Sequence, residues 1–226
     1  MNNMKEKINI DERYHEHDEI SVNHKKNQQP YYKSIRETFN NDWDSIGSFI
    51  DVGCREGYLM DEIYTNNKDK IVAGIDYFTW GKKLWDDDYW IHDHYNQWDM
   101  RDTLNGTEWF NFVKQNKLFD IVNCTEVAEH IDPDYCNIFM ENLKMLTNKY
   151  LIISWSPDDI HNGASDPYHQ HVNALQRDDF YNKMDEFDFM INAELTDKLI
   201  ECCNKHNSPS WYVKNHISIW ENYTDI

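Results

Sequence analysis

The residues best placed to do chemistry lie in the stretch 49–59, which reads FIDVGCREGYL. An apolar run ends in Asp51, and Gly53 and Gly57 then lead into an expected helix. Such a sharp turn after a strand lets a cofactor touch bare backbone, because glycine accepts positive φ and has no Cβ. An ordinary tight turn is the alternative interpretation of this loop.

Two further acids follow expected strands. Residues 70–76 form an apolar run that ends in Asp76, 25 residues after Asp51. An acid at this position in dinucleotide-binding folds accepts hydrogen bonds from both ribose hydroxyls, because a carboxylate has only acceptors. Capping of the next helix is the alternative role for Asp76. Asp99 follows the short expected strand 95–98, where its carboxylate can accept from an exocyclic amine such as that of adenine.

These residues can come together only if the strands before them end at the same edge of a sheet. Helices must then lead the chain from the end of one strand to the start of the next. Hydrophobic periodicity predicts strands at residues 48–52, 70–76, 95–98, 118–124, 150–155, 188–192 and 211–220. It predicts helices at residues 31–39, 58–64, 107–115, 133–146, 176–187 and 194–204. Because regular strand–helix alternation is typical of βαβ units, we expect an α/β fold with a doubly wound, mostly parallel sheet.

The composition indicates one globular domain with an acidic surface. The chain has 226 residues, of which 40% are hydrophobic, and this suits a single core. Residues 1–30 are polar and lack periodicity, so we expect a flexible N-terminal arm followed by a single domain at 31–226. The net charge of −19 makes nucleic acid and anionic membranes unlikely partners.

The cysteines and the first residues indicate a reducing compartment. The five cysteines are odd in number and include no CxxC pair, which argues against a disulfide framework and a zinc site. The first residues lack the apolar core of a signal peptide, and no run approaches membrane-spanning length. We therefore expect a cytoplasmic protein without membrane insertion, and its oligomeric state stays open.

The glycine loop and the two acids, together with the segment 119–131, resemble the class I S-adenosylmethionine (SAM)-dependent methyltransferases. That segment contains FDIV and, further on, EVAEHI. The resemblance covers nearly all of the chain except the arm. It implies a Rossmann-like, seven-stranded sheet with helices on both faces, mostly parallel, whose last strand enters antiparallel between the fifth and sixth.

The downstream part of the chain is similar to a branch of small bacterial and phage methyltransferases often linked to surface-glycan genes. The similarity rests on His171-Val172-Asn173, on Glu194-Leu195-Thr196 with Leu199, and on Trp211-Tyr212 with Asn215.

The resemblance implies SAM as the cofactor, S-adenosylhomocysteine (SAH) as its product, and a set of contacts for the cofactor. These contacts are Asp51, Gly53 and Gly57 for the methionine part, Asp76 for the ribose, Asp99 and Met100 for adenine, and Asn123, Cys124 and Thr125 for the sulfonium and its methyl group. Arg55 and Glu56 depart from the family pattern, because small residues are frequent at their positions.

A hydroxyl acceptor also needs a base, because it loses its proton as it attacks the methyl group. We expect His171, which falls on the His-Val-Asn pattern, as the base, with His130 second and Asp158 able to orient or replace it. The polar segment 156–173 follows the fifth strand, at the edge where this fold class binds substrates. Further acceptor contacts are expected from His161, His169, Asn173, Trp211 and Tyr212. The alternatives are a histidine that only fixes a loop and aromatic rings that only pack.

Paired histidines raise the possibility of a bound metal ion. Three His-x-His pairs, at residues 15–17, 92–94 and 169–171, each place two imidazoles on one side of an extended segment. No third ligand is fixed by spacing, so a divalent metal is possible but not favoured.

These observations together predict a SAM-dependent O-methyltransferase that acts on a small polar acceptor. A sugar of a surface polysaccharide, or its nucleotide-linked precursor, is the expected acceptor. The alternatives are a methyltransferase that acts on another small molecule, on protein or on nucleic acid, and a non-catalytic SAM-binding module.

Overall fold

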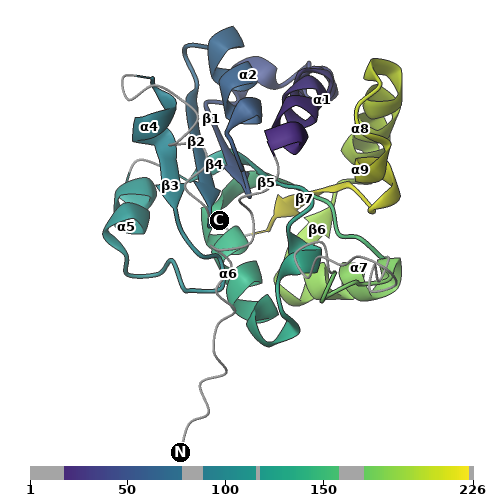
Figure 1. Ribbon diagram of the computed structural model, residues 1–226. Coiled ribbons are helices and arrows are strands. Elements are labelled where there is room, and N and C mark those ends of the chain that lie inside the picture. The colour runs from purple at the N-terminus through teal and green to yellow at the C-terminus, as the bar shows by residue number, and fades with distance from the viewer. Residues whose placement is uncertain (1–17, 78–88, 116–117, 158–170, 224–226) are drawn as a thin grey trace, which may run out of the picture.

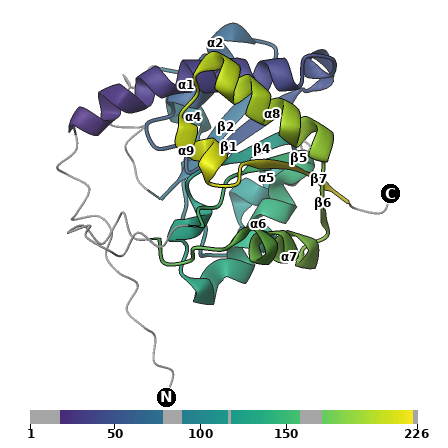
Figure 2. The ribbon, with the colours of Figure 1, turned by 90° about the vertical axis from the view of Figure 1, so that its right-hand side faces the viewer.

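The computed structural model describes residues 18–77, 89–115, 118–157 and 171–223 (Figure 1). Within these ranges, seven strands form one sheet, and helices cover both of its faces (Figure 2). The strands are β1 (Ser48–Val52), β2 (Ile71–Asp76), β3 (Tyr95–Gln97), β4 (Phe119–Cys124), β5 (Thr147–Ile153), β6 (Phe189–Ile191) and β7 (Ser218–Asn222). The helices are α1 (Asp18–Thr38), α2 (Tyr58–Asn66), α4 (Ile91–His94), α5 (Glu108–Gln115), α6 (Cys136–Leu146), α7 (Arg177–Glu186), α8 (Ala193–His206) and α9 (Ser210–Lys214), with 3-10 turns η1 (Trp43–Ser45), η2 (Ala128–His130) and η3 (Pro133–Tyr135).

The sheet has the order β3-β2-β1-β4-β5-β7-β6. Strands β1 to β5 pair in parallel, whereas β7 runs antiparallel between β5 and β6. This confirms the Rossmann-like sheet and the place of its last strand. The strand order reverses between β1 and β4, and in open α/β sheets ligands bind outside the carboxyl ends of the strands at such a point.

Two apolar clusters lie on opposite faces of the sheet. Successive residues of β4 show the division, because Ile121 packs with the cluster under α1, α2 and α8, and Val122 with the cluster under α5, α6 and α7. Both side chains are fully buried. Burial on both faces explains why the central strands read as continuous apolar runs rather than alternating ones.

Helix α1 begins well before the position that the sequence predicted. It starts at Asp18, so residues 18–30 of the expected arm are helical, and it packs between α2 and α8. Pro30 lies inside the helix, where proline has no N–H to donate. The sequence predicted a boundary there because residues 1–30 are polar and lack periodicity. Neither α1 nor any other described helix combines the length and apolarity needed to cross a bilayer.

The predicted strand 211–220 is correct only for its last three residues. Its first residues form α9, and β7 begins at Ser218. The aromatic and β-branched residues there favour a strand locally, but the buried Tyr212 ring packs on Tyr31 of α1 at a centroid distance of 4.6 Å. Tertiary packing therefore overrides the local preference.

Candidate active site

The carboxyl ends of β1, β2 and β4 bring Asp51, Asp76 and Asn123 together, and all three side chains are buried. Asp51 and Asn123 are partners in the register of β1 and β4, and Asn123 Nδ2 donates to Asp51 Oδ1 at 2.7 Å. Burial raises the pKa of Asp51 to about 7, the hydrogen bond from Asn123 opposes this, and the charge of Asp76 adds to it. A positively charged ligand at this edge would therefore stabilise the ionised carboxylate.

The glycine loop has the backbone that its sequence predicted. Gly53 has φ +77° and Gly57, the N-cap residue just before α2, has φ +82°. Asp76 Oδ2 accepts a hydrogen bond of 2.7 Å from the backbone N–H of Arg55, so the end of β2 holds the loop in place. A Cβ added at Gly53 would lie 2.2 Å from Cγ2 of Val127, so this position has no room for a side chain.

Asp99 and Met100 follow β3, as expected, but Asp99 has a protein partner. Arg101 Nε and Nη2 donate to its two oxygens at 2.8 to 3.1 Å. The backbone N–H of Arg101 also donates to Asp99 Oδ1, at 2.9 Å, so Arg101 engages both oxygens of this carboxylate. Met100 is buried in the apolar cluster under α5 and α6. The adenine contacts of both residues stay predictions.

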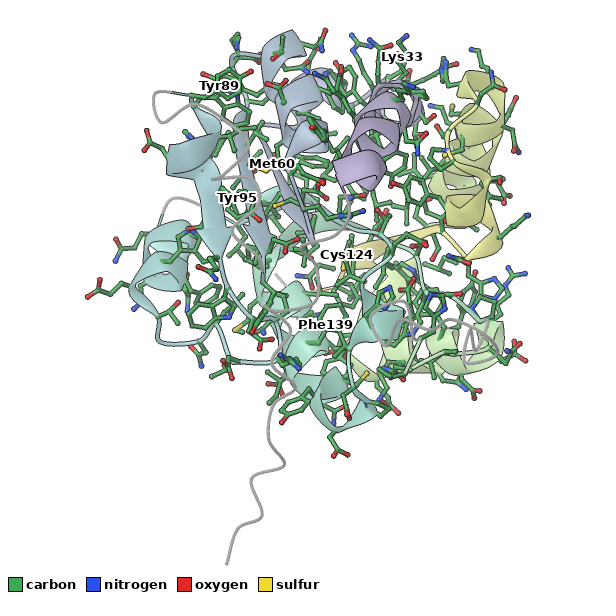
Figure 3. The ribbon with its side chains drawn as sticks, in the orientation of Figure 1. Lys33, Met60, Tyr89, Tyr95, Cys124 and Phe139 are labelled. Atoms are coloured by element: carbon green, nitrogen blue, oxygen red, sulfur yellow. The ribbon has the colours of Figure 1, made fainter. Side chains whose placement is uncertain are left out.

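Cys124 and Thr125 stand at the end of β4. Figure 3 shows Cys124 near the middle of the molecule, between Met60 of α2 and Phe139 of α6. Burial raises the pKa of the Cys124 thiol well above its usual range, so the group is a neutral thiol and not a nucleophilic thiolate. Asn123 Nδ2 lies 3.4 Å from Oγ1 of Thr125.

Helices α1 and α9 approach the same edge of the sheet (Figure 2). The Tyr31 hydroxyl donates to Asn123 Oδ1 at 2.8 Å, and the Tyr31 ring packs on that of Tyr212. Sequence reasoning missed Tyr31 as a site residue because its four-residue spacing with Ile35 and Phe39 indicated only an apolar helix face. Trp211 and Tyr212 both belong to α9, and their role as walls of the acceptor pocket stays a prediction.

The two predicted bases lie side by side. The rings of His130, in η2, and His171, after β5, have centroids 5.1 Å apart. The backbone N–H of Asn173 donates to the carbonyl of Glu129 at 3.0 Å, and this bond brings the segment after β5 to η2. His171 and Asn173 are buried and His130 is exposed. Asp158, His161 and His169 lie outside the described residues.

Two acids of the EVAEHI segment were not predicted as site residues. Glu126 accepts from Ser154 Oγ at 2.9 Å and from Asn215 Nδ2 at 2.9 and 2.8 Å. Glu129 is fully buried, and neither carboxylate oxygen has a hydrogen-bond partner among the described residues. Burial, together with the charge of Glu126, raises the pKa of Glu129 to about 8.

Comparison with known proteins identifies the family. A family model described as a methyltransferase domain matches residues 24–194. The chain belongs to this methyltransferase family. The resemblance to class I SAM-dependent methyltransferases is therefore confirmed.

Solved methyltransferase structures share the fold. The plantazolicin methyltransferase BpumL, in complex with SAH, is 14% identical with a TM-score of 0.53, over 90% of this chain and 87% of that one. The magnesium protoporphyrin IX methyltransferase of Synechocystis PCC 6803, with bound SAH, is 18% identical with a TM-score of 0.50, over 73% of this chain and 74% of that one. A search of curated proteins gives no match. At these identities the likeness to solved structures concerns the fold alone.

Proposed function

We propose that this methyltransferase transfers the methyl group of SAM to a hydroxyl of a small polar acceptor. A sugar of a surface polysaccharide, or its nucleotide-linked precursor, is the acceptor class. The observation that carries the proposal is the pair of buried carboxylates, Asp51 and Asp76, beside the glycine loop at the carboxyl edge of the sheet.

The chemistry of these donors fits SAM. The cofactor carries positive charge on its sulfonium and its amine, and the carboxylate of Asp51 is buried and destabilised until a cation approaches it. Asp76 accepts a bond from the backbone N–H of Arg55. A carboxylate offers only acceptors, which is what the two ribose hydroxyls require. The positive φ of Gly53 and Gly57 leaves backbone without side chains beside both acids.

When bound, SAM supplies a methyl group already activated by its sulfonium, so the protein contributes mainly orientation. Asn123, which pairs with Asp51, and Cys124 end β4, and Thr125 follows the strand. These three residues are proposed to line the methyl group. The neutral thiol of Cys124 adds no competing nucleophile. The protein therefore has to hold the acceptor oxygen in line with the S–CH3 bond at this point.

The paired imidazoles support a hydroxyl acceptor rather than an amine, because a hydroxyl must lose its proton during attack. His171 is the proposed base and His130 the second candidate. Their ring centroids are 5.1 Å apart, where the segment after β5 meets η2. The net charge of −19 supports a small acceptor over a nucleic acid.

The cofactor part is tested by calorimetry with SAM and SAH. Wild-type protein is expected to bind both, Asp76→Ala to lose binding, and Asp44→Ala, which changes an exposed acid of η1, to keep it. Absence of binding to the wild-type protein, or unchanged binding by Asp76→Ala, would refute the cofactor assignment.

The acceptor part is tested with tritiated SAM and a panel of sugars, nucleotide sugars and oligonucleotides. Label is expected in a base-stable ether of a sugar, and His171→Ala is expected to lose transfer while it keeps SAM binding. Label found only in an amine or an oligonucleotide would refute the hydroxyl acceptor.

A further inference from the structure

We propose that Glu129, His130 and His171 bind one divalent first-row transition-metal ion at the carboxyl edge of the sheet. In the part of the chain that the structure describes, these residues offer one carboxylate oxygen and two imidazole nitrogens that all lie within 4.8 Å of one another. This group differs from the three His-x-His pairs of the sequence, because its ligands come from two segments 41 positions apart.

The carboxylate of Glu129 is the observation that points to a ligand. Its side chain is fully buried, and neither oxygen has a hydrogen-bond partner among the described residues. A buried carboxylate without a partner is costly, because it has lost its hydration and gained nothing in return. A cation held between this carboxylate and the two imidazoles removes that cost.

The geometry is close to that of a formed site. Ligand atoms about 2.1 Å from one metal ion lie roughly 3 to 4 Å from each other. The observed span of 4.8 Å needs only a small rotation of the side chains to close. The bond from the Asn173 N–H to the Glu129 carbonyl fixes the two segments beside each other, so the backbone needs no rearrangement.

The neighbouring acid Glu126 is already engaged. Its oxygens accept from Asn215 and Ser154, so it holds the segment in place and is not counted as a ligand. Three protein ligands leave coordination positions open for water or for an oxygen of a substrate. His130 is exposed, so an ion can reach the site from solvent.

The donor set selects the kind of metal. Two imidazoles and one carboxylate suit Mn²⁺, Fe²⁺, Co²⁺ or Zn²⁺, whereas Mg²⁺ and Ca²⁺ prefer oxygen ligands alone. The net charge of −19 also favours cations near the molecule.

The use of the ion rests on the proposed function. An acceptor hydroxyl bound at an open position becomes more acidic, and its proton goes to solvent. Its oxygen forms the new bond to the methyl carbon, and the electron pair of the S–CH3 bond stays on sulfur, which gives SAH. An imidazole nitrogen that binds the metal cannot take the proton, so with the ion bound this role replaces the role of base proposed above for His171 and His130.

The test measures metal binding without SAM or an acceptor. Tag-free full-length protein is treated with EDTA and titrated with Co²⁺, and binding is followed by calorimetry and visible absorption. We expect one ion per chain. We expect Glu129→Gln and His171→Ala to weaken Co²⁺ binding by roughly tenfold or more. Loss of a metal ligand lowers the metal affinity at least as much as loss of a residue that hydrogen-bonds to a ligand.

His94→Gln is the matched control, because His94 lies in α4 outside the group and is expected to leave binding unchanged. His130→Ala changes an exposed side chain, so it tests the site even if Glu129→Gln fails to fold. No Co²⁺ binding by wild-type protein, or equal binding by wild type and His130→Ala, would overturn the site. A chain that binds Co²⁺ through these residues but transfers no methyl group would keep the site and refute only the proposed function.

Discussion

The hydroxyl of Tyr31 donates a hydrogen bond of 2.8 Å to the side-chain oxygen of Asn123, 92 positions further along the chain. The amide nitrogen of Asn123 donates in turn to Asp51 at 2.7 Å. These two partners fix the orientation of the amide, because Asp51 can only accept when ionised. Helix α1 therefore contributes a side chain to the candidate active site at the carboxyl ends of β1, β2 and β4, besides covering the sheet.

The first prediction concerns Tyr31→Phe. Loss of the hydroxyl leaves the Asn123 oxygen without its donor, which is expected to cost about 1 kcal/mol of unfolding free energy and to weaken SAM binding several-fold. Tyr32→Phe is the matched control on the same helix, because it removes an acceptor for Asn67 Nδ2 at 3.1 Å, and that contact lies away from the site. Urea unfolding is expected to show similar losses for both variants, and calorimetry a loss of affinity for Tyr31→Phe alone. Equal SAM affinities would refute the role of Tyr31.

The sheet and the glycine loop could be predicted because their signals are local. An apolar run followed by an acid predicts where a buried parallel strand ends, and strand β1 (Ser48–Val52) has the predicted bounds. The parallel strands then place Asp51, Asp76 and Asn123 at one edge without further information. The positive φ of Gly53 and Gly57 follows from the same turn.

The contacts between distant segments could not be predicted in the same way. The Tyr31–Tyr212 pair depends on where α1 and α9 dock, and the residues of α9 read locally as a strand. The approach of His171 to Glu129 depends on the bond that Asn173 makes to η2. The periodicity of a single segment cannot predict these contacts, because each contact forms only when two distant segments pack together.

Asp51 predicts how cofactor binding changes with pH. Its pKa of about 7 in the folded protein exceeds the ordinary value of 3.8, so its ionisation costs stability as the pH rises between these values. A cationic ligand lowers that pKa, so binding of SAM releases a proton and tightens with pH. The affinity at pH 8 is expected to be about tenfold higher than at pH 6, since the ionised fraction changes by about that factor.

Calorimetry in buffers of different ionisation enthalpy checks the released proton. Asp51→Asn is expected to bind SAM weakly at every pH, without the rise. Asp44→Asn, the control at an exposed acid, is expected to keep it. A rise that persists in Asp51→Asn would assign the titration to another group.

Alanine substitutions at Gly53 and Gly106 distinguish the cost of backbone strain from the cost of a steric clash. Both have positive φ, +77° and +85°, but a Cβ at Gly53 meets Val127 at 2.2 Å, whereas Gly106 has open space around it. Gly106→Ala is expected to cost about 1 kcal/mol from strain alone. Gly53→Ala is expected to cost about 2 to 4 kcal/mol and to abolish SAM binding, because the loop or Val127 must move. Equal costs in urea unfolding would show that the loop accommodates a side chain.

Asn215 is predicted to stabilise the segment that carries Glu129 and His130. Its Nδ2 donates to both oxygens of the half-buried Glu126, and Ser154 Oγ donates to one of them. Asn215→Ala is expected to cost about 2 kcal/mol, because the carboxylate loses the amide group that donates to both of its oxygens. Ser154→Ala acts on the same carboxylate, so the double variant is expected to be non-additive by at least about 0.5 kcal/mol.

Asn148→Ala supplies the control for that cycle. Asn148 donates to Asp120 at 2.9 Å, but it is exposed, and among the described residues it shares no hydrogen-bond partner with Ser154. The losses of unfolding free energy in Asn148→Ala and Ser154→Ala are expected to add to within about 0.3 to 0.5 kcal/mol. Urea unfolding of the wild-type protein, the three single variants and the two double variants measures both couplings. Additive losses of unfolding free energy for Asn215→Ala and Ser154→Ala would mean that the two residues are not coupled through Glu126.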